Sequence, residues 1–119
     1  MNTHQHVAMV EGANLRSEMV QGRPVVMVDV RSEREFNEVH IPGAVNVPLQ
    51  QFAQVAAELA RLTQGRDLVL VCRTDRRAQQ ARQLLADQGR ADARILQGGM
   101  VHWIDEDGPT QWAQRPRGC

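Results

Sequence analysis

Short, largely apolar runs constrain the fold of this chain more than any other feature of its sequence. The runs are Val25–Val30, Ala44–Val47 and Leu68–Val71, with a weaker one at Ala93–Leu96. They do not show the strict polar and apolar alternation of a sheet that has one face in water. Apolar runs of this kind are typical of parallel strands that are covered on both faces. We therefore predict a buried sheet.

Segments with helical spacing lie between these runs. Residues 51–62 and 77–87 each place apolar side chains along one helical face, and Gly89 follows the second segment as a typical C-terminal residue. Ser32 and Glu35 match a capping box, which predicts a short helix directly after the first strong strand. Strands that alternate with helices indicate an α/β fold with a mainly parallel sheet.

Composition excludes several functional classes. The chain has 119 residues, the size of one domain, and its 14 Lys and Arg balance its 14 Asp and Glu. With no overall basic charge and no polybasic arm, we expect neither nucleic-acid nor membrane binding. The first fifteen residues lack the pattern of a signal peptide, and no apolar run approaches the roughly twenty residues of a membrane span. We expect a soluble, cytoplasmic protein.

The two cysteines, Cys72 and Cys119, lie far apart, and the second is the last residue. They form neither a disulfide framework nor a zinc pattern, so we expect no metal and no cofactor. A reduced protein with a free thiol is the natural interpretation. We expect Cys119 to be a surface residue of the C-terminal tail.

Cys72 directly follows the Leu68–Val71 run, and a predicted helix begins about four residues later. Ligands bind beyond the carboxyl ends of the strands in α/β sheets. Inward backbone amides, a helix N-terminus and the guanidinium groups of Arg73, Arg76 and Arg77 all favour a thiolate. Such a thiolate is a nucleophile that needs no histidine base. The local sequence fits equally a small core residue beside a solvated helix face, and it leaves both interpretations open.

Three segments in order carry a resemblance to a known family. They are "VDVRSEREFNEVHIPGAVNVPL" at 28–49, "CRTDRR" at 72–77 and "LQGGMVHW" at 96–103. Together they resemble the rhodanese-like (sulfurtransferase) family from about Ala13 to Pro109. The resemblance implies a three-layer α/β/α domain over residues 13–110, with a mainly parallel five-stranded sheet. Residues 1–12 are then expected to be a flexible N-terminal segment and residues 111–119 a C-terminal tail.

The resemblance also implies a chemistry. Cys72 is expected to attack the outer sulfur of a donor such as thiosulfate, releasing sulfite and leaving a persulfide. A thiophilic acceptor (cyanide, a thiol or a sulfur-accepting protein) then takes the sulfur. By the same resemblance Arg73 faces the anionic end of the donor and Arg77 braces the loop. The backbone amides from Thr74 to Ala78 form the anion cradle.

Two residues depart from the family pattern, in which a glycine usually stands at Asp75 and a serine or threonine at Ala78. Aspartate tolerates a left-handed backbone, so we expect the loop to close. Asp75 also stands where an N-cap belongs, and its carboxylate is expected to accept from the first amides of the helix. A carboxylate near the cradle opposes a second anion, although Arg76 is placed to offset that charge.

Asp29, Arg31 and Glu35 match polar positions of the family. For each we favour a supporting role over a catalytic one, as a buried hydrogen bond or ion pair that holds the loops.

Two alternatives remain open. Cysteine phosphatases and arsenate reductases of the same fold resemble C-x5-R, whereas Cys72 to Arg77 is C-x4-R, and the shorter loop suits sulfur better than phosphate. A non-catalytic regulatory or sulfur-carrier binding module is the other alternative. The presence of Cys72 argues against it, while Asp75 and Ala78 keep it open.

Overall fold

The computed structural model of this chain describes residues 9–113, and a five-stranded sheet lies at its centre. The strand order is β1-β6-β5-β2-β4, and every neighbouring pair is parallel. The strands of this sheet are β1 (Met9–Val10), β2 (Val25–Asp29), β4 (Val45–Asn46), β5 (Asp67–Val71) and β6 (Arg94–Leu96). The mainly parallel sheet predicted from the apolar runs is confirmed.

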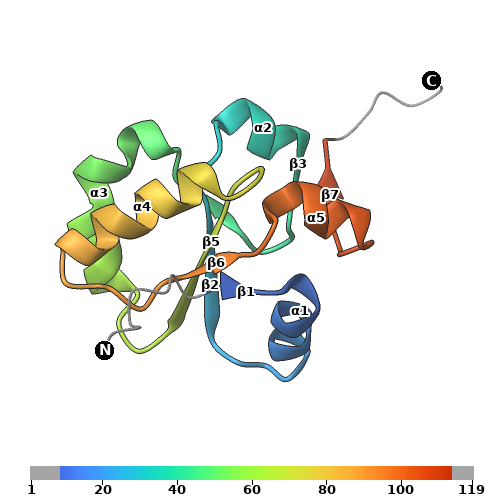
Figure 1. Cartoon of the computed structure of the whole chain (residues 1–119), viewed down its shortest axis with the longest axis horizontal. Coiled ribbons are helices and arrows are strands. Elements are labelled where there is room, and N and C mark those ends of the chain that lie inside the picture. The colour runs from blue at the N-terminus through green and yellow to red at the C-terminus, as the bar shows by residue number, and fades with distance from the viewer. Residues whose placement is uncertain (1–8, 114–119) are drawn as a thin grey trace.

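Five helices surround the sheet and complete three layers (Figure 1). They are α1 (Gly12–Val20), α2 (Glu33–Glu38), α3 (Leu49–Leu62), α4 (Arg76–Asp87) and α5 (Gly99–Asp105). Helices α3 and α4 pack on one face of the sheet, and α1 and α5 cover the other. Helix α2 begins with the predicted capping box, in which Ser32 accepts from the Glu35 amide and Glu35 accepts from the Ser32 amide.

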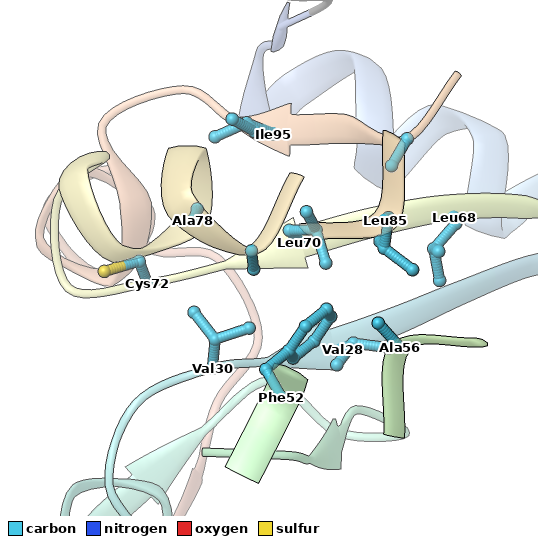
Figure 2. Close-up of a cluster of buried hydrophobic side chains, with 12 residues drawn as sticks. Val28, Val30, Phe52, Ala56, Leu68, Leu70, Cys72, Ala78, Leu85 and Ile95 are labelled. Carbon is cyan, nitrogen blue, oxygen red and sulfur yellow. The ribbon is translucent and has the colours of Figure 1, made fainter. Parts of the chain in front are cut away.

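The two faces of β5 feed two separate core clusters because side chains alternate along a strand. Leu68 and Leu70 point toward α3 and α4, where they pack with Phe52. Val69 and Val71 point the other way, toward a cluster that includes Trp103 of α5. Figure 2 shows the first cluster, with Cys72 at its end and the sulfur directed away from the other labelled side chains.

Two elements lie outside the domain bounds that the sequence predicts. Strand β1 belongs to the central sheet, although residues 9 and 10 fall in the segment expected to be flexible. Strand β7 (Gln111–Trp112) pairs antiparallel with β3 (Val39–His40), although it falls in the expected tail. Both are two-residue strands held by partners far along the chain, so local sequence gives no sign of them. Helix α1 also begins within the expected flexible segment, at Gly12, while residues 1–8 and 114–119 with Cys119 lie outside the described residues.

Helices long and apolar enough to cross a membrane are not found among residues 9–113.

Candidate active site

Cys72 is the first residue after β5, at the carboxyl end of the sheet. It carries a free thiol and is 2% exposed. Its side chain continues the alternation of Leu68 and Leu70 and packs at the edge of the same cluster, near Ala78. The two interpretations that the local sequence left open are thus compatible, since Cys72 is a buried residue that also stands at the ligand-binding edge of the sheet.

The loop after Cys72 is held by hydrogen bonds from the start of α5. The Met100 amide donates to the Cys72 carbonyl over 2.8 Å, and the Val101 amide donates to the Arg73 carbonyl over 3.1 Å. Gly99 makes this close approach possible, because a Cβ there would lie under 3.0 Å from the carbonyl oxygens of Cys72, Arg73 and Thr74. The loop therefore turns its first carbonyls toward α5.

The opposite side of the loop presents backbone amides. In a trans peptide the N–H points away from the preceding carbonyl, so the Arg73 and Thr74 amides are directed away from α5. Within residues 9–113 no hydrogen-bond acceptor is found for the amides from Arg73 to Ala78. Six consecutive donors without a protein partner beside a thiol form an arrangement suited to binding an anion.

Asp75 does not have the role that its position predicts. Its φ of −121° and ψ of −16° are not left-handed, so the loop closes without a special backbone conformation at this residue. Its carboxylate receives no bond from the first turn of α4 in the described structure. Instead, Oδ1 accepts from the Gly98 amide over 3.0 Å. Asp75 is the N-cap residue of α4 as predicted, but the expected capping bond is absent because a tertiary donor, 23 residues along the chain, takes the carboxylate.

Arg77 links the loop to α2 through a bidentate ion pair. Its Nη1 and Nη2 donate to Oε1 and Oε2 of Glu35 over 2.7 and 3.0 Å. This pairing lowers the pKa of Glu35 to about 2, with a smaller contribution from the hydrogen bonds of Ser32. It also raises the pKa of Arg77, and the nearby Cys72 adds to that shift. The guanidinium thus binds the carboxylate and lies near the thiol.

The remaining loop residues divide into exposed and buried ones. Arg73, Thr74 and Arg76 are exposed, and the two arginines form no ion pair with any acidic residue in the described part of the chain. Ala78, in the first turn of α4, is fully buried. The exposed guanidinium groups are available to an incoming anion.

Asp29 and Arg31 form a buried ion pair at the end of β2, the strand next to β5. Arg31 Nε and Nη2 donate to the Asp29 carboxylate over 2.8 to 3.1 Å, and Nη2 also donates to the Val39 carbonyl over 2.7 Å. The Val30 amide between them donates to the Val71 carbonyl, one residue before Cys72. The pair therefore supports the strand ends beside the cysteine without lying in the loop itself.

A pocket of about 340 Å³ opens beside Arg77, between the end of β2 and the start of α3. It is lined by polar and apolar residues, namely Val30, Ser32, Glu33, Pro48, Leu49, Gln50, Gln51 and Arg77. A larger groove of about 800 Å³ lies between residues 64–67 and 88–92. This groove is at the amino ends of β5 and β6, the end of the sheet opposite to Cys72. Clusters of three or more potential metal ligands are not found among residues 9–113.

A family model, that of the rhodanese-like domain, matches residues 13–106 of the chain. The chain belongs to the rhodanese-like family. A solved structure with the same fold is that of the rhodanese-like domain of the Anabaena protein Alr3790, with a TM-score of 0.79 and 26% identity. The match covers 96% of this chain and 88% of that one.

Two curated relatives place this rhodanese-like domain in different settings. The thiosulfate sulfurtransferase GlpE of Shewanella oneidensis is 31% identical over 103 residues, which cover 87% of this chain and 95% of GlpE. The HTH-type transcriptional regulator Rv0324 of Mycobacterium tuberculosis is 37% identical over 111 residues, covering 84% of this chain. This chain spans only 47% of the regulator's length. The family therefore includes both a sulfurtransferase and a regulator that carries a similar domain.

The sequence did not reveal what Gly98 and Gly99 do in this rhodanese-like domain. The pair predicts a tight turn, and both residues do have positive φ, 75° and 58°. Their contacts with the loop at Cys72–Asp75 come from the packing of α5 on the carboxyl end of β5. The signal available in the sequence was the pair itself, placed just after the Ala93–Leu96 run.

Proposed function

We propose that the protein is a sulfurtransferase of the thiosulfate sulfurtransferase type, which carries a sulfane sulfur as a persulfide on Cys72. The observation that carries this proposal is the run of amides from Arg73 to Ala78, which directly follow the cysteine and have no protein acceptor within residues 9–113. Such a cradle stabilises a thiolate, an anionic donor and the anionic persulfide alike. The likeness to GlpE supports the same chemistry.

In the first half-reaction the Cys72 thiolate attacks the outer sulfur of the donor. A sulfur–sulfur bond forms to Cys72, the sulfur–sulfur bond within thiosulfate breaks, and sulfite leaves with the electron pair. Arg73 is exposed and placed to meet the anionic end of the donor. Arg77, held by Glu35, braces the loop and keeps a positive charge beside the sulfur.

In the second half-reaction a thiophilic acceptor attacks the outer sulfur of the persulfide. Cyanide leaves as thiocyanate and a thiolate leaves as its persulfide, and in both reactions Cys72 is released as the thiolate. The two half-reactions share a covalent intermediate, so ping-pong kinetics are expected. We place the acceptor, a small thiol or a thiol of a sulfur-accepting protein, in the pocket beside Arg77. A cytoplasmic setting, where thiols stay reduced, is part of the proposal.

The direct test is intact-mass spectrometry after incubation with thiosulfate, mercaptopyruvate or glutathione persulfide. We expect one added sulfur atom on the protein, removed by cyanide or a thiol and missing in Cys72→Ser. Cys119→Ala is the matched control and should still gain the sulfur. If none of the three donors adds a sulfur to Cys72, the proposal is wrong.

A regulatory module is the second candidate, favoured by the likeness to the transcriptional regulator. It predicts that Cys72 forms no adduct or forms one that no acceptor removes with turnover. Hydrolysis of an aryl phosphate together with no reaction toward sulfur donors would instead indicate a phosphatase.

A further inference from the structure

The role of the Asp75 carboxylate in the loop is not explained by anion binding to the backbone amides. The conformation of its backbone is open to any residue, and its carboxylate does not cap its own helix. The contact that the structure does give the side chain is with the Gly98 amide, at 3.0 Å from Oδ1. This contact is partly buried, which makes it costly to leave the amide without an acceptor.

The contact belongs to a set of three that join the loop to the start of α5. The Met100 and Val101 amides donate to the carbonyls of Cys72 and Arg73, and the Gly98 amide donates to Asp75. The first two bonds involve backbone atoms that every sequence has. The third depends on the side chain of Asp75, so it is the one that a substitution can remove without changing the backbone.

We propose that Asp75 is a positioning residue, whose carboxylate fixes the cradle amides around Cys72 by accepting from Gly98. This role rests on the proposed function for its catalytic consequence, since the anion held by the cradle would be the sulfur donor. Because the carboxylate is directed toward Gly98, its charge is turned to the side of the loop that faces α5. The Arg73 and Thr74 amides, which have no protein acceptor within residues 9–113, are directed away from that side.

The positioning role and the repulsion expected from the sequence predict opposite effects on donor binding when the Asp75 carboxylate is removed. A carboxylate that faces the cradle repels an anionic donor, so that removing it strengthens donor binding. A carboxylate that positions the loop has the opposite effect, because its loss allows the amides to move away from the anion. Misplacement of such donors by fractions of an ångström is costly for anion binding and for catalysis.

Two variants of Asp75 separate these possibilities. Asp75→Ala removes the acceptor, whereas Asp75→Asn removes the charge and keeps an oxygen that can accept from Gly98. Asp105→Ala is the matched control, since Asp105 is an exposed carboxylate of α5 outside the loop. Each variant is made in the full chain.

The first readout does not depend on sulfur transfer. The alkylation rate of Cys72 is measured by peptide mass spectrometry with iodoacetate, an anion, and with iodoacetamide, its neutral analogue. We expect the ratio of the two rates to fall about tenfold in Asp75→Ala and to stay within about twofold of the wild type in Asp75→Asn and Asp105→Ala. Hydrogen exchange at the Gly98 amide should accelerate in Asp75→Ala alone.

The second readout is persulfide formation with thiosulfate. We expect kcat/KM to fall about tenfold in Asp75→Ala, mainly through KM, with recovery in Asp75→Asn. A rise of the alkylation ratio in both Asp75 variants would overturn the positioning role, as would an unchanged ratio in Asp75→Ala. If the wild type forms no persulfide while the alkylation ratio behaves as expected, the proposed function fails and the positioning role stands.

Discussion

Arg77 has two neighbours, Cys72 and Glu35. A nearby positive charge favours the thiolate form of Cys72, and the carboxylate of Glu35 holds that charge in place. The bidentate geometry fixes both the position and the direction of the guanidinium, which a single contact would not do. Glu35 is itself fixed by the capping box of α2 through Ser32. The position of the charge beside Cys72 therefore depends on the local structure of α2, because Glu35 of this helix, 42 residues before Arg77 in the chain, holds the guanidinium.

Glu35→Gln should lower the free energy of unfolding by about 1–2 kcal/mol at pH 7, a discounted value because both side chains are about a third exposed. The folded pKa of about 2 lies below the unfolded value of about 4.3, so the stabilisation is complete above pH 4.3 and is lost as the pH falls toward 2. Urea denaturation of wild type and variant between pH 7 and pH 2.5 measures this difference.

Glutamine still completes a capping box, so the variant tests the ion pair and not the cap. Glu33→Gln, in the same first turn of α2, is the control and should show little change at either pH. A stability difference that stays constant down to pH 2.5 would contradict the assignment of the pKa shift to Arg77.

At the scale of elements, the junction between the loop and α5 is the part of the site with the least room. Gly99 combines a φ of 58° with contact to three successive carbonyl oxygens of the loop. Both facts come from the close packing of one helix start on one strand end. The amides without a protein acceptor, which form the cradle of the proposed function, follow from this packing on the other side of the loop.

Gly99→Ala should lower the free energy of unfolding by about 3–4 kcal/mol and slow persulfide formation, because the added Cβ would separate the loop from α5. Thermal and urea denaturation with the persulfide assay measure both effects. Gly89→Ala is the matched control, since Gly89 has a φ of 89° but nothing within 4 Å of the added Cβ. It isolates the backbone strain, about 1–2 kcal/mol. Equal losses in the two variants would show that the contact with the loop carbonyls has no effect.

The elements marked by an apolar run, a helical stripe or a capping box were predictable from the sequence. Helix α4 begins one residue before the predicted segment and α3 two residues before it, and β2, β5 and β6 match their apolar runs to within a residue or two. The elements that were missed are α1, α5 and the short strands β1, β3 and β7. A two-residue strand has no periodicity, and it exists because a distant partner completes its hydrogen bonds.

The same reason explains which parts of the site could be predicted. Cys72 and its basic neighbours follow each other in the chain, so the motif and the strand before it located them, and the segments at 28–49 and 96–103 favoured the interpretation of Cys72 as a nucleophile. The partners of Asp75 and Arg77 are 23 and 42 residues away, and no local rule selects them. The Asp75 carboxylate was expected to accept from the first amides of α4 because a capping rule considers only the residues next to it.

At the scale of the whole molecule, the site is built on the central sheet, while the small β3–β7 sheet is attached at one side. Its connection to the site is indirect, through the Val39 carbonyl that accepts from Arg31. The Ala113 amide, which donates to the Glu38 carbonyl over 2.8 Å, closes this sheet. The sheet therefore adds to the stability of the domain without supplying a group to the loop.

Deletion of residues 111–119 should lower the free energy of unfolding by no more than about 1 kcal/mol, because β7 has two residues and both are exposed. Persulfide formation should be unchanged, which would also exclude a relay through Cys119. Urea denaturation and intact-mass spectrometry test these outcomes, with Trp112→Ala in the full chain as control. A loss above about 3 kcal/mol would instead make the last residues an integral part of the domain.

Cys72 lies on the same face of the sheet as Leu68 and Leu70 because side chains alternate along a strand. Whether the number of residues between them is odd or even therefore decides on which face the thiol lies. Inserting or deleting one residue within β5 would send the sulfur to the opposite face of the sheet, toward Trp103, however well the loop itself were preserved. Substitutions in the loop can tune this site gradually. A one-residue change in the length of the strand removes the thiol from the site in one step. A design that transplants the loop onto another sheet therefore has to preserve the strand register before the loop residues are chosen.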